Sequence, residues 1–68
     1  MKYYAFLNEE KNLESVKNAA DAIIGIAEGI QVKKTRNDFA VLLFESGLSI
    51  SEIKPLLCKG DWIIEERL

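Results

Sequence analysis

The pattern of apolar and polar positions divides the chain into six segments, of which the first two are a strand and a helix. Residues 2–7 are mostly aromatic and aliphatic, and the polar residues 8–12 follow them, which predicts a buried strand and then a loop. From residue 13 the apolar positions recur every three or four residues, the spacing of an amphipathic helix: Leu13, Val16, Ala20, Ile23, Ile24 and Ala27. We expect Asn12 to cap this helix and Gly29 to end it, with an earlier end at Gly25 as the alternative.

The second half of the chain shows a hairpin, a short helix and a last strand. Residues 30–34 alternate between apolar and polar, as an edge strand does, and a loop of about four turn-forming residues, 35–38, joins them to the apolar run 39–44. Ser49 and Glu52 match a capping box that begins a helix, although Ser51 is an alternative cap because Pro55 must lie near the first turn. Residues 61–68 predict the final strand. The apolar stripe of the second helix comprises Ile50, Ile53, Leu56 and Leu57, and we expect Cys58 beside it to be buried.

This order of elements predicts one α+β domain over residues 1–68. Strand, helix, strand, strand, helix, strand is the split βαβ, or ferredoxin-like, order. Right-handed crossovers would then place both helices on one face of a four-stranded antiparallel sheet, with the first and third strands in its centre.

The third strand, residues 39–44, is apolar on both of its alternating faces. A single layer of helices covers only one face, so the other should carry an interface. One of two sets, Phe39, Val41 and Leu43 or Ala40, Leu42 and Phe44, points at the helices and the other points away, and either choice leaves apolar surface uncovered. We expect a homodimer packed sheet to sheet through Phe39, Val41 and Leu43, with Tyr3 or Tyr4 beside them. The small size of the chain favours the same answer, because a domain of about 60 residues has a marginal core that oligomerisation often supplements.

The amino-acid composition excludes several kinds of chemical site. The chain has one cysteine and no histidine, so it can form no disulfide within itself and cannot assemble the usual zinc ligands; we expect no cofactor and no metal. Its four serines have no histidine to activate them. The lone thiol, the absence of an export signal and the absence of a long apolar segment favour a cytoplasmic protein that does not cross a membrane.

A nucleic-acid-binding alternative rests on the basic residues Lys33, Lys34 and Arg36. Residues 37–44 partly resemble the signature of the RNA-recognition motif, with Phe39 at an aromatic position, whereas Val41 replaces the second stacking aromatic. The net charge of −2 argues against strong attraction to nucleic acid that is independent of base sequence.

The second half of the chain resembles the small CRISPR-adaptation nucleases and the related ferredoxin-like antitoxin RNases. The resemblance lies in residues 39–44, in Ser51-Glu52-Ile53 with Leu56-Leu57, and in residues 61–65. It implies a homodimer, and nuclease members carry a metal-binding acidic residue at the end of the first strand, where this chain has Asn8 followed by Glu9 and Glu10.

The sequence therefore predicts a non-enzymatic homodimer that binds another macromolecule, in particular a protein, as an antitoxin, a regulator or a phage-type inhibitor does. A metal-dependent nuclease or a single-stranded RNA-binding protein of the same fold is the alternative.

Overall fold

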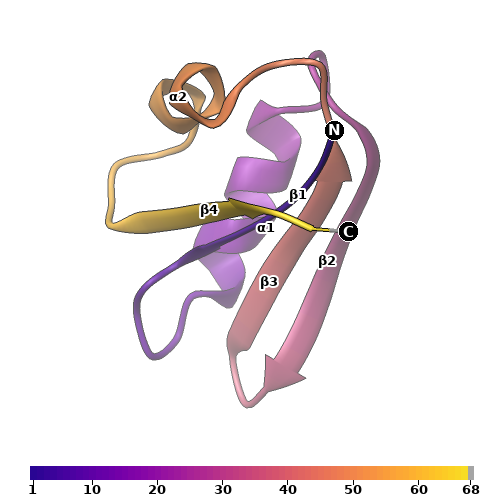
Figure 1. The fold of residues 1–68 in the computed structure, drawn as a ribbon. Coiled ribbons are helices and arrows are strands. Elements are labelled where there is room, and N and C mark those ends of the chain that lie inside the picture. Colours follow the sequence, from indigo (N-terminus) through magenta and orange to yellow (C-terminus); the bar gives the residue numbers. More distant parts are fainter. Residues whose placement is uncertain (68) are drawn as a thin grey trace.

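The fold is α+β, with four antiparallel strands and two helices. A computed structural model describes residues 1–67 (Figure 1). The elements are β1 (Lys2–Leu7), α1 (Leu13–Ala22), β2 (Glu28–Arg36), β3 (Phe39–Glu45), α2 (Ile50–Ile53), the 3-10 helix η1 (Lys54–Leu56) and β4 (Trp62–Glu66). The strands pair in the order β2-β3-β1-β4, and every neighbouring pair is antiparallel. The predicted central position of β1 and β3 is thus confirmed.

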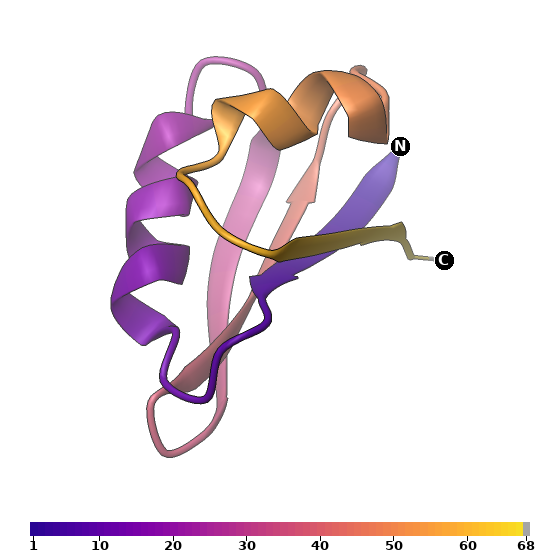
Figure 2. The same ribbon diagram turned by 90° about the vertical axis from the view of Figure 1, so that its left-hand side faces the viewer.

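The core lies between the sheet and the helices. Figure 2 shows α1 along one side of the sheet, with α2 and η1 crossing near its end; no helix of residues 1–67 covers the other side. Every second residue of β1 and β3 is buried against the helices. The core also takes side chains from both helical segments and from β4; its members are Tyr3, Ala5, Leu7, Val16, Ala19, Ala20, Ile23, Ala40, Leu42, Phe44, Ile53, Leu57, Trp62 and Ile64.

Asn12 joins β1, α1 and β3 within this core. It precedes α1 as predicted, but its side chain makes no capping hydrogen bond. Instead its Nδ2 donates to the carbonyl of Leu7 at 2.8 Å, and its Oδ1 accepts from the backbone N–H of Ala40 at 2.7 Å. The side chain is completely buried, so these two bonds satisfy groups that water cannot reach.

The first helix is shorter than its apolar pattern predicts. It ends at Ala22, and residues 23–26 form a turn, so the earlier alternative near Gly25 is the better prediction. Ile24 consequently leaves the apolar stripe and is 66% exposed. Gly29 does adopt a positive φ of 60°, but it lies in β2, at an irregularity in the pairing with β3, and does not end the helix.

The hairpin turn and the second helix also differ from expectation. The turn between β2 and β3 contains only two residues, because Arg36 pairs with Phe39, and Asn37 adopts the left-handed conformation with a φ of 42°. Ser49 is the cap of α2, so the alternative cap Ser51 is wrong. The α2 segment continues as η1, in which Leu56 is exposed; Cys58 after it is exposed as well, contrary to prediction.

The last strand ends at Glu66, and Leu68, which was expected to belong to this strand, lies outside the described residues. In the described part of the chain no helix is both long and apolar enough to cross a membrane.

Replacement of Asn12 by alanine should strongly destabilise the fold. It would leave the carbonyl of Leu7 and the N–H of Ala40 buried without partners, and each such group costs about 1–3 kcal/mol. Urea unfolding followed by circular dichroism should therefore show a loss of about 2–5 kcal/mol, whereas Asn18→Ala on the exposed side of α1 should change the stability by less than about 0.5 kcal/mol. Similar unfolding curves for the two variants would contradict this role of Asn12.

The Glu52 carboxylate should make stability fall in acid. It accepts hydrogen bonds from the backbone N–H of Ser49 at 3.1 Å and from the Ser49 hydroxyl at 2.9 Å, and these bonds lower its pKa from the ordinary value of 4.5. A lowered pKa in the folded state means that the contribution is complete above pH 4.5 and disappears as the pH falls through the folded-state pKa. Glu52→Gln should therefore lose less stability than the wild type between neutral pH and pH 3 in parallel thermal melts, and equal losses would exclude this linkage.

Candidate interaction surface on the uncovered side of the sheet

Six apolar side chains form the side of the sheet that faces away from the helices, which we call the open face. They come from alternating positions of the two central strands and of β4, and all are half-buried by their neighbours: Tyr4, Phe6, Phe39, Val41, Leu43 and Ile63. Tyr4 lies opposite Leu43, and Phe6 lies opposite Ile63. The rings of Phe6 and Phe39 are in contact, with their centroids 5.7 Å apart. The apolar residues are therefore continuous across three strands.

Most of the residues predicted for a partner surface lie on this face. Phe39, Val41 and Leu43 do so together, and Tyr4 lies beside Leu43. Tyr3 does not, because it belongs to the core and is only 1% exposed. Its hydroxyl donates to the carbonyl of Leu48 at 2.6 Å, and its ring packs against Phe44. Of the two tyrosines named from the sequence, only Tyr4 can reach a partner.

The sequence reasoning missed Phe6 and Ile63. A signal was present, because Phe6 is two positions after Tyr4 and side chains two apart share a strand face. Phe6 could have been identified once Tyr4 was chosen over Tyr3. Ile63 required the pairing of β1 with β4, which the alternation within a single strand does not specify.

The β2 side of the open face is basic. Lys33 pairs with Val41 and Arg36 pairs with Phe39, so both lie on the same side of the sheet as these apolar residues. Lys34 pairs with Ala40, a core residue, and therefore lies on the other side of the strand. All three are exposed. The basic cluster predicted from the sequence is thus divided between the two faces, and two of its members border the open face.

The β4 side of the open face is acidic. Glu65 lies directly opposite Tyr4. Desolvation of the Tyr4 hydroxyl raises its pKa, and the negative charge of Glu65 raises this pKa further. Asp61 precedes β4, and its carbonyl accepts a hydrogen bond of 3.0 Å from the N–H of Asn8 at the end of β1. The β2 border is therefore mainly basic and the β4 border mainly acidic, although each has one residue of the opposite sign at the same end of the sheet, Glu28 on β2 and Arg67 after β4.

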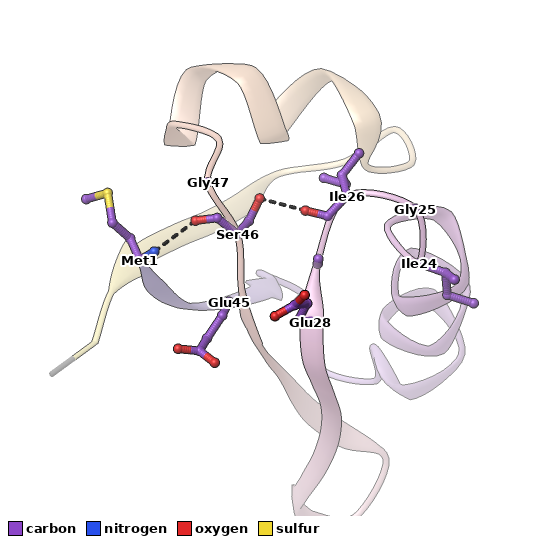
Figure 3. A pocket seen from close by; sticks show the side chains of 9 residues that line it. Met1, Ile24, Gly25, Ile26, Glu28, Glu45, Ser46 and Gly47 are labelled. Atoms are coloured by element: carbon purple, nitrogen blue, oxygen red, sulfur yellow. Dashed lines mark hydrogen bonds between the residues drawn. The ribbon is translucent and has the colours of Figure 1, made fainter.

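A separate hollow lies between the end of α1 and the end of β3 (Figure 3). Its volume is about 620 Å³, and it is open to solvent. The α-amino group of Met1 donates to the carbonyl of Ser46 at 2.9 Å, and the Ser46 hydroxyl donates to the carbonyl of Ile26 at 2.8 Å. These bonds tie the chain start and the α1–β2 turn to the end of β3. The carboxylates of Glu28 and Glu45 face the hollow from paired positions of β2 and β3.

The acidic residues do not combine into a metal centre. Within residues 1–67, no three His, Cys, Asp or Glu side chains are grouped closely enough to hold a metal ion. Asn8, Glu9 and Glu10 follow β1 in an exposed loop, in which the N–H of Glu9 donates back to the carbonyl of Leu7. The position at which the nuclease resemblance places a metal ligand is therefore an exposed turn with a neutral first residue.

The open face is thus the feature with the clearest capacity for function: a continuous apolar surface bordered by two oppositely charged strands. It has the composition of an interface, with apolar residues in the centre and charges at the rim. Comparison of the chain with protein-family models, curated proteins and solved structures finds no match.

Proposed function

We propose that the protein is a small, non-enzymatic, cytoplasmic homodimer that binds another macromolecule, with the open face as the surface between its subunits. One observation carries the proposal: six apolar side chains lie together on a side of the sheet that none of the described helices covers. Continuous apolar surface of this kind marks interaction sites in proteins. The regulatory role, whether as an antitoxin, a regulator or an inhibitor that binds a protein partner, is proposed from the resemblance of the second half of the chain to antitoxin RNases.

Energetics support self-association. A chain of this length buries only about 60% of its unfolded surface and gains only about 3–5 kcal/mol from one core. Covering the open face with a second copy would remove further apolar surface from water at about 25 cal/mol per Å². An interface of standard size needs about 800 Å² on each partner. The folded chain exposes 4466 Å², so such an interface would occupy about a fifth of its surface.

We assign the topology to the ferredoxin-like, split βαβ class as part of the same proposal. The strand order β2-β3-β1-β4 and the antiparallel pairing of all neighbours support the assignment. The short second helix supports it less, because α2 contains only four residues and continues as the 3-10 helix η1. The exposed Cys58 thiol is in keeping with a reducing compartment.

Binding of single-stranded RNA to the open face is the second candidate function. It is favoured by the contact between Phe6 and Phe39 on the central strands, since paired aromatic rings can stack on bases. Lys33 and Arg36 beside these rings could contact phosphates. The acidic β4 border opposes this function, because Glu65 would repel the backbone of a strand that crosses the sheet.

Val41→Glu should convert the dimer into a folded monomer. Val41 lies in the middle of the open face, so a charge there would have to be buried in the interface without a partner, whereas in a monomer it meets water. Sedimentation velocity should show a dimer for the wild type and a monomer for the variant, with unchanged far-ultraviolet circular dichroism. Asn18→Glu, which adds the same charge on the exposed side of α1, should remain dimeric. A Val41→Glu dimer as stable as the wild type would exclude the open face as the subunit interface.

A second experiment distinguishes the two candidate functions. The wild type is mixed with single-stranded RNA and DNA at low salt, with magnesium or manganese, and is examined for a gel shift and for cleavage. The proposed function predicts neither effect. If the wild type is a monomer that shifts RNA, and the Phe39→Ala variant does not shift it, RNA binding would replace the homodimer as the proposed function. Metal-dependent cleavage would favour a nuclease.

A further inference from the structure

The charged borders of the open face specify how two copies face each other. We propose that the copies stack open face to open face about a two-fold axis that runs parallel to the central strands, so that the basic β2 border of each copy lies over the acidic β4 border of the other. This inference rests on the proposed homodimer and adds its geometry. The occupant of the open face is a second copy of this chain, chosen by complementary charge.

The strand register arranges the open face in four rows that cross the sheet from β2 to β4. Paired residues on neighbouring strands define most of each row. The β1–β3 pairing runs only from Lys2–Glu45 to Ala5–Leu42, and we extend its register to place Phe6 in the row of Val41 and Asn8 in the row of Phe39. The two inner rows are mainly apolar: Gln31, Leu43, Tyr4 and Glu65 form one, and Lys33, Val41, Phe6 and Ile63 form the next. The outer rows extend beyond them to the sheet ends: Glu28, Glu45, Lys2 and Arg67 form one, and Arg36, Phe39, Asn8 and Asp61 form the other.

The shape of the sheet permits two arrangements. Figure 1 shows that β4 crosses the other strands at a steep angle, so the sheet is strongly twisted and its open face is saddle-shaped. Two identical saddle-shaped faces stay at a constant separation from each other when the two-fold axis that relates them runs either along the strands or across them. Packed sheets are separated by about 10 Å in both cases. The shape of the sheet therefore does not distinguish the two axes, and the contacts between side chains must do so.

An axis along the strands places every row over its own copy, reversed from edge to edge. In the centre, Leu43 then lies over Tyr4 of the second copy and Val41 over Phe6 of the second copy, so that apolar residues cover one another. In the outer rows, opposite charges meet in three contacts: Glu28 faces Arg67 of the second copy, Glu45 faces Lys2 of the second copy, and Arg36 faces Asp61 of the second copy. In the inner rows one charged side chain of each copy, Lys33, lies over an apolar one, Ile63 of the second copy.

An axis across the strands places each strand over its own copy. If the axis passes through the Val41 row, Lys33 lies over Lys33 of the second copy, and Glu65 over Asp61 of the second copy, so like charges meet. If it passes between the two inner rows, Glu28 lies over Arg36 and Arg67 over Asp61 of the second copy, which are two opposite-charge contacts. However, Glu45 then lies over Phe39 and Glu65 over Ile63 of the second copy, so two carboxylates of each copy are buried against apolar side chains without partners. Both outcomes are costly. The axis along the strands is therefore the favoured one.

Arg36 and Asp61 provide the discriminating pair. Within one chain they lie on opposite borders of the sheet, separated by three strand spacings or about 14 Å, so they cannot form an ion pair with each other. Any specific coupling between them must therefore act between copies. Lys2 and Glu45 are less informative, because they are also direct neighbours within one chain.

The test uses Arg36→Glu and Asp61→Lys, alone and mixed. Each variant alone forms a dimer with two repulsive contacts, and should self-associate about tenfold or more weakly than the wild type at low salt. An equimolar mixture should recover association close to that of the wild type, because the mixed dimer contains one native Arg36–Asp61 contact and one reversed contact. The matched control mixes Arg36→Glu with a chain that carries Arg36→Glu, Glu9→Lys and Glu10→Lys: the total charge equals that of the first mixture, but residues 9 and 10 lie in a loop outside the rows and both 36–61 contacts stay repulsive, so association should not recover. Sedimentation equilibrium measures all of these.

The outcomes separate this inference from the proposed function. Recovery in the first mixture but not in the control supports the axis along the strands. A dimeric wild type whose two variants show no recovery when mixed would overturn the inference and leave the homodimer intact. A monomeric wild type would overturn both.

Discussion

The structure depends on a mismatch between one layer of helices and a sheet that is apolar on both sides. Side chains alternate strictly along a strand, so when Ala40, Leu42 and Phe44 enter the core, Phe39, Val41 and Leu43 must lie on the other side. The helices cannot cover both. The core face is complete, whereas the open face has its own apolar surface and charged borders but no cover within the described residues. The proposed interaction with another molecule rests on this uncovered apolar surface.

Buried polar groups decide which face is inside. The Asn12 side chain bridges the end of β1 and the start of β3, and the Tyr3 hydroxyl donates to the carbonyl of Leu48. These bonds are satisfied only in this register, because a slip of one residue would turn Tyr3 to the outside and carry Ala40 away from Asn12. The apolar residues provide most of the stabilisation, while these hydrogen bonds select one arrangement of two nearly equivalent faces. Residues of the opposite layer therefore determine which apolar side chains lie on the open face.

The charges at the borders make the two edges of the apolar surface chemically different. Without them the open face would be a patch that associates in any orientation, which favours aggregation. With a basic β2 border and an acidic β4 border, the face differs from one edge to the other, and a matching partner must present the same sequence of charges in reverse. A second copy of the chain does so by symmetry. The proposal thus assigns specificity to the charged borders and affinity to the apolar centre of the same surface.

The sequence by itself determined the class of the fold, the order of its elements and the two-sided third strand. These follow from periods of two and of about four in the apolar positions, which are local properties. It also placed the Ser49–Glu52 capping box, whereas the ends of α1 and of the β2–β3 turn were misplaced because tertiary packing sets such boundaries. Only the tertiary structure decided that Tyr3 lies inside and Tyr4 outside, that Asn12 bridges two strands, and that Phe6 and Ile63 complete the open face. The reason is that strand register and pairing join residues distant in sequence, and no local pattern encodes which of two apolar faces meets the helices.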